Sequence, residues 1–237
     1  MKANNFTASQ LAKYFDHTAL KAETTANDIR KLCEEALELG TAAVCVNPLW
    51  IPLAAKCLQG SQVMPITVVG FPLGAMGTGS KVHEAREAVA CGAMEIDMVL
   101  SVGEIKSGLL NEARRDIVSV KQAIEDVPLK VIFETALLNT DEIAMVARWC
   151  AEDGIDYVKT STGFSSRGAS VQDVLTMRQA INSVTDSRTK IKASGGIRTL
   201  KEAMLFIEAG AERIGASATK AIVAELTGGK ALSSKGY

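Results

Sequence analysis

The feature that most constrains the fold is an alternation of apolar helical stretches with short runs rich in β-branched residues. Short β-branched runs that alternate with amphipathic helices are typical of βα units on a parallel sheet. Eight such units in 237 residues, without a linker rich in Pro, Gly or Ser, predict a single-domain (β/α)8 TIM barrel of the α/β class over residues 1–237. The eight predicted strands are Tyr14–Thr18, Ala42–Val46, Ile66–Phe71, Glu95–Leu100, Leu129–Thr135, Tyr157–Thr162, Lys190–Ser194 and Arg213–Ser217.

Glycines at the expected helix ends support this division of the chain. Four of them stand between a helical stretch and the next strand, namely Gly40, Gly92, Gly154 and Gly210. Glycine accepts the left-handed backbone conformation that ends many helices. An open doubly wound sheet is the alternative, but it usually carries a Gly-rich nucleotide turn after its first strand, and no such turn follows Thr18.

The composition excludes several classes of partner. With 26 Lys and Arg against 27 Asp and Glu, the net charge is −1, so nothing attracts nucleic acid or an anionic membrane to the whole molecule. Charged residues interrupt every apolar stretch before the ~18 residues that span a bilayer, and the N-terminus lacks a secretory signal, so we expect a cytoplasmic protein. Five cysteines without a Cys-x-x-Cys pair and only two histidines predict no metal site.

Polar residues at the predicted strand ends are the candidates for chemistry, because barrel enzymes place their catalytic groups there. These residues are Asp16, His17, Cys45, Asn47, Asp97, Glu134, Thr135, Lys159, Thr160, Lys192, Ser194 and Ser217.

Two lysines stand out in this set. Lys159 and Lys192 lie on consecutive strands, which are neighbours in a barrel. Two ammonium groups ~4 Å apart repel by ~4 kcal/mol at an effective dielectric constant near 20, enough to bring a lysine pKa of ~10.4 towards neutrality. The neutral amine could attack a carbonyl while Asp97 moves protons. The alternative is a structural ion pair of each lysine with an acid such as Asp97 or Glu134. Lys190 starts its strand and is expected in solvent.

An anion site is predicted beyond the last strands. Gly163, Gly195, Gly196 and Gly215 follow or end strands six to eight, together with Ser217. Barrels often bind phosphate through backbone N–H groups in these loops and at a helix N-terminus. Ordinary turns would explain any one of these glycines, but their joint position favours phosphate.

Three other patterns are interpreted structurally. GAMGTGSK at 74–81 has the glycine spacing of a phosphate-binding P-loop, but Ser80 precedes Lys81, the reverse of the motif, and HEARE at 83–87 lacks the second histidine of a zinc motif. Met94 and Met98 are expected in the core.

Several motifs, in order along the chain, closely resemble the bacterial deoxyribose-phosphate aldolase family: GTAAVCVNP, VVGFPLGA, EIDMV, YVKTSTGF, IKASGGIRT and IGAS. The resemblance implies a class I aldolase that reversibly cleaves 2-deoxy-D-ribose 5-phosphate to D-glyceraldehyde 3-phosphate and acetaldehyde, without a metal or organic cofactor. Lys159 would be the Schiff-base nucleophile, with Asp97 and Lys192 as its proton relay and pKa-lowering partner. The substrate and phosphate contacts would include Asp16, Cys45, Thr160, Gly163, Gly195, Gly196, Gly215 and Ser217.

The chain departs from the family at two positions beside the phosphate loops: Phe164 and Ala218 stand where some members have lysine and serine. The family often ends in a tyrosine that reaches the active site, and this chain ends in Tyr237, on a C-terminal tail of about residues 228–237 that the sequence predicts to be mobile. A homodimer is the assembly we expect. Alternative functions are another phosphate-binding barrel enzyme, either an isomerase or transaldolase-like, and a non-catalytic sugar-phosphate binding barrel.

Overall fold

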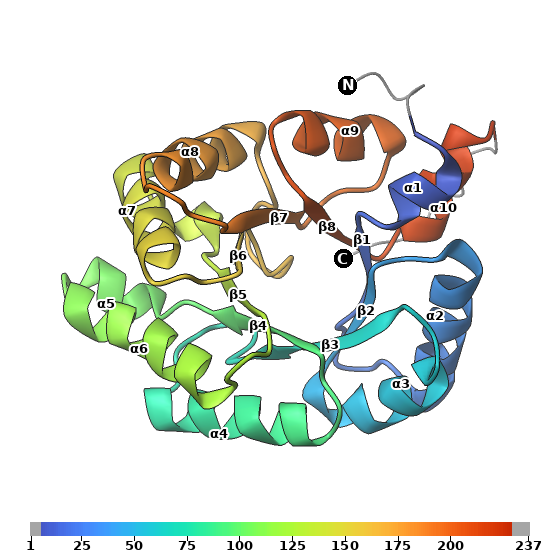
Figure 1. Cartoon of the computed structure of the whole chain (residues 1–237), viewed down its shortest axis with the longest axis horizontal. Helices are drawn as coiled ribbons and strands as arrows, with labels where there is room; N and C mark the ends of the chain where they lie inside the picture. The colour runs from blue at the N-terminus through green and yellow to red at the C-terminus, as the bar shows by residue number, and fades with distance from the viewer. Residues whose placement is uncertain (1–5, 229–237) are drawn as a thin grey trace.

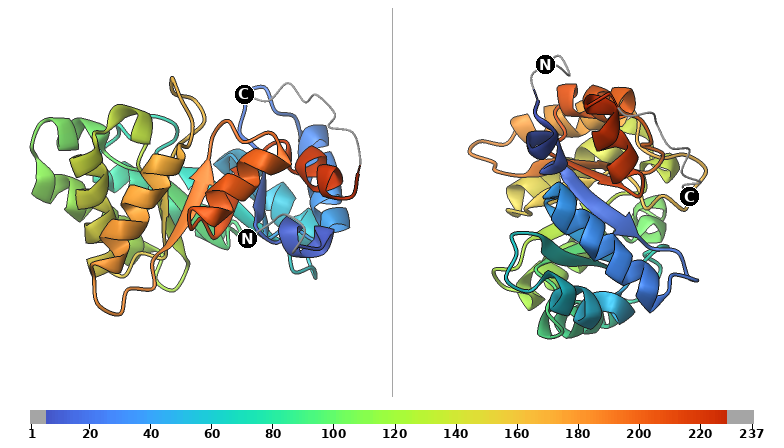
Figure 2. Two further views of the ribbon diagram at one scale, coloured as in Figure 1. Left: turned by 90° about the horizontal axis from the view of Figure 1, so that it is seen from above. Right: turned by 90° about the vertical axis from the view of Figure 1, so that its right-hand side faces the viewer.

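The computed structural model describes residues 6–228. Eight parallel strands pair in chain order and close into a barrel, with β8 paired to β1. Figure 1 shows the helices as a ring outside the strands, and the two further views in Figure 2 show the same helices packed around the outside of the barrel. The predicted (β/α)8 barrel is confirmed.

The elements follow the order expected from the sequence. The strands are β1 (Phe15–Ala19), β2 (Ala43–Val46), β3 (Met64–Val69), β4 (Glu95–Val99), β5 (Leu129–Ile132), β6 (Tyr157–Lys159), β7 (Lys190–Ser194) and β8 (Arg213–Ala216). The helices are α1 (Ala8–Ala12), α2 (Ala26–Leu39), α3 (Ile51–Leu58), α4 (Thr78–Ala90), α5 (Val102–Lys106), α6 (Leu110–Ala123), α7 (Thr140–Glu152), α8 (Val171–Asn182), α9 (Leu200–Glu208) and α10 (Thr219–Leu226), with short 3-10 turns η2 (Pro48–Trp50) and η3 (Thr135–Leu137).

Local sequence signals fix the helix ends. Thr25 and Thr199 each begin a helix with a capping box, in which the cap hydroxyl accepts from a backbone N–H and an acidic side chain accepts from the backbone N–H of the cap. All four predicted helix-ending glycines have a positive φ, between 67° and 107°. These residues therefore set where each helix stops and where the next strand begins.

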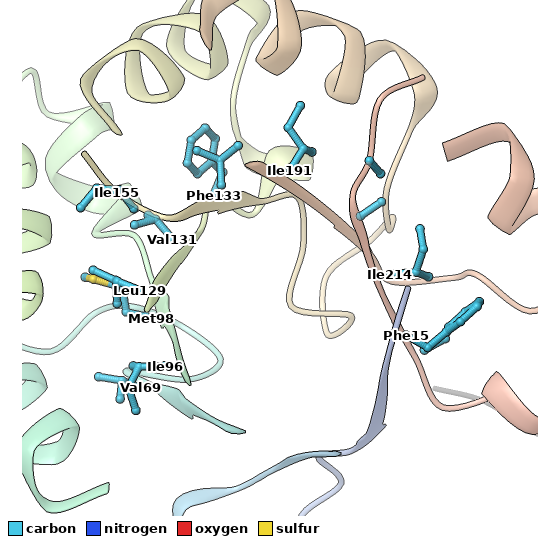
Figure 3. Close-up of a cluster of buried hydrophobic side chains, with 14 of the residues drawn as sticks. Phe15, Val69, Ile96, Met98, Leu129, Val131, Phe133, Ile155, Ile191 and Ile214 are labelled. Carbon is cyan, nitrogen blue, oxygen red and sulfur yellow. The ribbon is translucent and has the colours of Figure 1, made fainter. Parts of the chain in front are cut away.

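The main hydrophobic core lies between the barrel wall and the helices. Figure 3 shows part of it, where side chains such as Phe15, Ile96 and Ile214 leave the strands towards the helical layer. Met98 is buried in this core as expected, whereas Met94 is 53% exposed, so its predicted burial was wrong. Met94 directly precedes β4, outside the alternation that directs strand side chains inward or outward.

Five predicted strands end earlier than expected, and the difference is largest, at three residues, for β5 and β6. β5 stops at Ile132 because Glu134 takes a left-handed conformation, with φ 53°, that cannot continue a strand. β6 stops at Lys159, and residues 160–170 form the loop that leads to α8.

Within the described part of the chain, no helix is long and apolar enough to cross a membrane.

Candidate active site

The inside of the barrel holds a network of charged side chains, beside a small apolar cluster that includes Cys45 and Ile66. Its members are Asp16 on β1, Glu95 and Asp97 on β4, Lys130 on β5, Lys159 on β6, Lys192 on β7 and Arg213 on β8, and all are buried. The strand register pairs Lys159 with Lys192 and Asp97 with Lys130, and paired residues of neighbouring strands face the same side. Burying so much charge is costly, so these groups must satisfy one another.

Asp97 is the centre of this network. Its Oδ2 accepts hydrogen bonds from Lys159 Nζ at 2.9 Å and from Lys192 Nζ at 2.7 Å. Its Oδ1 accepts from Lys130 Nζ at 2.8 Å. Three ammonium groups therefore converge on one carboxylate, and they hold the pKa of Asp97 well below its usual range despite burial, which opposes this shift.

The remaining contacts close the network into a ring. Lys192 Nζ donates to Asp16 Oδ2 at 2.5 Å, and Arg213 Nη1 donates to Asp16 Oδ1 at 2.6 Å. Arg213 Nη2 lies 3.4 Å from Glu95 Oε1, and Lys130 Nζ lies 2.5 Å from Glu95 Oε2. Among residues 6–228, each cation of the network except Lys159 thus contacts two carboxylates, whereas Lys159 contacts Asp97 alone.

This arrangement identifies Lys159 as the amine that gives up its proton most easily. Four cations face three carboxylates, so a network with every group ionised has an excess positive charge in a buried site. Burial lowers the pKa of Lys159, and the charge of Lys192 lowers it further, while Asp97 opposes both effects. In Lys130, Lys192 and Arg213 the carboxylates outweigh burial and raise the pKa.

The main cause of the lowered pKa of Lys159 is not the one predicted from the sequence. Repulsion by Lys192, the cause expected from the sequence, does lower the pKa of Lys159, but burial of Lys159 contributes most. The side chain is only 3% exposed, so its charged form has lost nearly all of its hydration.

Above the network, a pocket opens at the ends of the strands. It contains about 490 Å³ of space when the part that is open to solvent is counted. Lys159 lines it together with Thr162, Gly163, Gly195, Gly196, Gly215 and Ser217, so the structure brings the predicted nucleophile and the predicted phosphate residues into one cavity. Arg198, which the sequence analysis did not select, lines the same pocket.

The backbone of this pocket depends on glycine. Gly163, Gly195 and Gly196 have φ values of 92°, 87° and 78°, which side chains disfavour. A Cβ on Gly215 would stand 3.1 Å from Lys192 Cε, so the absence of a side chain there leaves room for the lysine. α10 begins at Thr219, directly after Ser217 and Ala218, so an unpaired helix N-terminus adjoins the pocket.

Several predicted residues lie outside the pocket lining. Asp16 lies deeper, paired with Lys192 and Arg213. Cys45 is fully buried, and burial raises the pKa of its thiol to about 11, which keeps it protonated. Thr160 joins β6 to β7, because its hydroxyl donates to the Ser194 carbonyl and accepts from the Ser194 N–H. Tyr237 and most of the predicted mobile tail lie outside the described residues.

Two further strand-end candidates do not join the site. His17 packs outside the barrel, where its Nε2 lies 3.1 Å from Glu35, and Asn47 donates to the Leu20 carbonyl.

Sequence reasoning missed Glu95, Lys130 and Arg213, although their alternation with apolar neighbours in EIDMV, LKVI and RIGA was a signal for inward-facing charge. Among residues 6–228, no group of three or more His, Cys, Asp or Glu side chains could hold a metal.

Comparison with known proteins agrees with this geometry. Residues 10–225 match the model of the DeoC/LacD family aldolases. The chain is 51% identical to deoxyribose-phosphate aldolase of Mannheimia succiniciproducens, over 90% of this chain and 94% of the relative, and 49% identical to that of Brevibacillus brevis, over 95% and 98%. A solved structure of deoxyribose phosphate aldolase from Aeropyrum pernix, described as a unique tetramer, superposes with a TM-score of 0.82 at 28% identity, covering 93% of this chain and 92% of that one. The chain belongs to the DeoC/LacD family of aldolases.

Proposed function

We propose that this protein is a class I aldolase that reversibly cleaves 2-deoxy-D-ribose 5-phosphate to D-glyceraldehyde 3-phosphate and acetaldehyde. The observation that carries the proposal is the state of Lys159: among the four cations of the buried network, it alone has a lowered pKa and lines the pocket. A neutral buried amine beside a proton-transferring carboxylate is the arrangement that imine chemistry requires.

The reaction begins at the C1 aldehyde of the open-chain sugar. The neutral Lys159 amine adds to C1, and loss of water gives a protonated imine. Removal of the proton from the 3-hydroxyl forms the C3 carbonyl as the C2–C3 bond breaks, and the electron pair moves into the imine to give an enamine. D-Glyceraldehyde 3-phosphate leaves, C2 takes up a proton, and water hydrolyses the imine to release acetaldehyde and Lys159.

Asp97 and Lys192 support the proton transfers in this sequence. Asp97 touches Lys159 directly and can carry protons between the reacting groups and the lysines. Lys192 has a raised pKa, so it stays charged and disfavours a second positive charge on Lys159. Asp16 pairs with Lys192 and holds it in place, and Arg213 pairs in turn with Asp16.

The phosphate end of the substrate binds among the glycines. Gly163, Gly195, Gly196 and Gly215 let the backbone approach an anion closely, and Ser217 stands just before the N-terminus of α10. Arg198 supplies a cation to the same pocket.

The location and assembly of the protein follow as further proposals. An ionised sugar phosphate does not cross a membrane unaided, so we propose that this protein works in the cytoplasm, in the same compartment as its substrate. Assembly as a homodimer remains a prediction, which size-exclusion chromatography with light scattering tests.

Trapping of the imine tests the proposal. The protein is incubated with acetaldehyde, reduced with borohydride, digested and analysed by mass spectrometry. A two-carbon addition on Lys159 is expected, together with aldehyde products from 2-deoxyribose 5-phosphate. A label on Lys192 would reverse the two roles. Absence of any label, as an isomerase or a binding barrel would give, would contradict the class I mechanism.

A further inference from the structure

Glu134 stands out as a buried residue held in an unfavourable backbone conformation. Only three non-glycine residues between 6 and 228 have a positive φ, namely Glu125, Glu134 and Asp186. Glu125 and Asp186 lie in exposed turns, where strain of this kind is common, whereas Glu134 is 5% exposed. Since glycine would fit this conformation better, the presence of a glutamate here points to a task for its side chain.

The carboxylate of Glu134 acts on a single residue. Its Oε2 accepts from the hydroxyl of Thr162, and the Thr162 N–H lies 3.4 Å from the same oxygen. Its Oε1 is buried and has no hydrogen-bond partner in the described part of the chain. A carboxylate removed from water with half of its acceptor capacity unused is a poor source of stability. Its effect is therefore concentrated on Thr162.

Thr162 transmits this contact to the pocket. The Thr162 hydroxyl donates to Glu134 Oε2 and keeps a lone pair for the Phe164 N–H, 3.1 Å away. Gly163 lies between these two anchored residues and lines the pocket. Its Cα is 3.5 Å from where a Cβ on Gly195 would stand, so the two glycines face each other closely.

A second contact joins the loop after β6, residues 160–170, to the segment that follows β5. Arg167 Nη2 donates to the Thr135 carbonyl at 3.0 Å, and Gly168 packs directly against the Gly195 backbone. The segment after β5 thus contacts the loop of residues 160–170 near both of its ends. Glu134 contacts the end nearer Lys159, and Thr135 contacts the end nearer α8.

We propose that Glu134 is a positioning residue that sets the direction of the Gly163 backbone towards the phosphate of the substrate, acting through Thr162. Glu134 does not line the pocket, so it acts without touching the substrate. This inference rests on the proposed function, because it assigns a structural device to the phosphate end of that site.

The test compares a phosphorylated substrate with its unphosphorylated counterpart. In Glu134→Gly, which removes the carboxylate and suits the positive φ, KM for 2-deoxyribose 5-phosphate should rise about tenfold or more, while KM for 2-deoxyribose changes by less than about twofold. The rate of borohydride trapping with acetaldehyde, which carries no phosphate, should stay near that of the wild type. Glu125→Gly relieves the same backbone conformation at an exposed turn and serves as the matched control, with no change expected in either KM.

A second pair of variants tests the route through Thr162. Thr162→Val removes the hydroxyl and should reproduce the Glu134→Gly defect, whereas Thr162→Ser keeps the hydroxyl and should retain most of the affinity for the phosphorylated substrate. The double variant Glu134→Gly/Thr162→Val should be no worse than either single variant, because both break one chain of contacts.

The outcomes separate this inference from the proposed function. If the wild type cleaves neither substrate, the proposed function fails. If the wild type is active but Glu134→Gly raises both KM values equally, or neither, Glu134 has no positioning role at the phosphate end. Circular dichroism and thermal melts of each variant show whether the fold is retained, and Thr162→Val, which breaks the same contact from its other side, provides the comparison should Glu134→Gly fail to fold.

Discussion

Replacement of Lys192 by methionine tests the electrostatic account of the nucleophile. Lys192 and Lys159 donate to the same oxygen of Asp97, at 2.7 and 2.9 Å. Two nitrogens that share an acceptor in this way lie about 4.5 Å apart, and two unit charges at that separation repel by roughly 3.5 to 4 kcal/mol at an effective dielectric constant of about 20. Loss of Lys192 removes this repulsion.

The sign of the effect follows from the charge count. With Lys192 absent, three carboxylates face three cations, and Lys159 becomes the third cation that the network needs. The pKa of Lys159 therefore rises, although burial still lowers it. Imine formation needs the neutral amine, so at neutral pH its rate should fall by about 100-fold to 1,000-fold and recover as the pH is raised. Asp16 keeps Arg213 and Asp97 keeps Lys130, so no carboxylate is left without a cation.

The assay is the initial rate of borohydride-trapped adduct with acetaldehyde, measured by intact mass between about pH 6 and pH 10, where lysine amines with lowered pKa titrate. Lys192→Arg keeps the charge and should keep the wild-type pH profile where it folds. Lys190→Met removes an exposed lysine from the same strand and face, and should leave the profile unchanged. A Lys192→Met profile that coincides with wild type would show that burial alone sets the reactivity of Lys159.

Four other outcomes are expected. Lys159→Ala should abolish trapping and lower turnover by orders of magnitude, as product assays would show. Wild-type turnover should survive prolonged treatment with a strong chelator, because the imine supplies the electron sink. A loss of activity that zinc restores would contradict this second expectation. Asp97→Asn should accumulate covalent adduct without turning over, visible by mass spectrometry in the presence of substrate, and normal turnover would exclude Asp97 as the proton carrier. Gly168→Ala should lower the free energy of unfolding by about 1–3 kcal/mol in denaturant titrations, because its Cβ would stand 2.0 Å from the Gly195 carbonyl oxygen; an unchanged midpoint would show that the loop can move aside.

The sequence by itself determined the barrel and the reactive end of the site. Alternation of apolar helices and β-branched runs, with glycine at the helix ends, is local information, and the observed strands match the predicted ones within a few residues. The position of Lys159 and Lys192 on neighbouring strands follows from strand order alone, because a (β/α)8 barrel pairs consecutive strands. The glycines of the pocket were likewise visible as a group at the ends of the last three strands.

Only the tertiary structure decided how the charges are shared. Lys130 and Arg213 come from β5 and β8, and their contacts with Asp97, Glu95 and Asp16 join residues more than 30 positions apart in the chain. Which lysine loses its proton depends on burial and on the count of carboxylates around each nitrogen, and both are properties of the closed barrel. The task of Glu134 was hidden for the same reason, because its backbone conformation and its contact with Thr162 exist only once β5 and β6 are paired side by side.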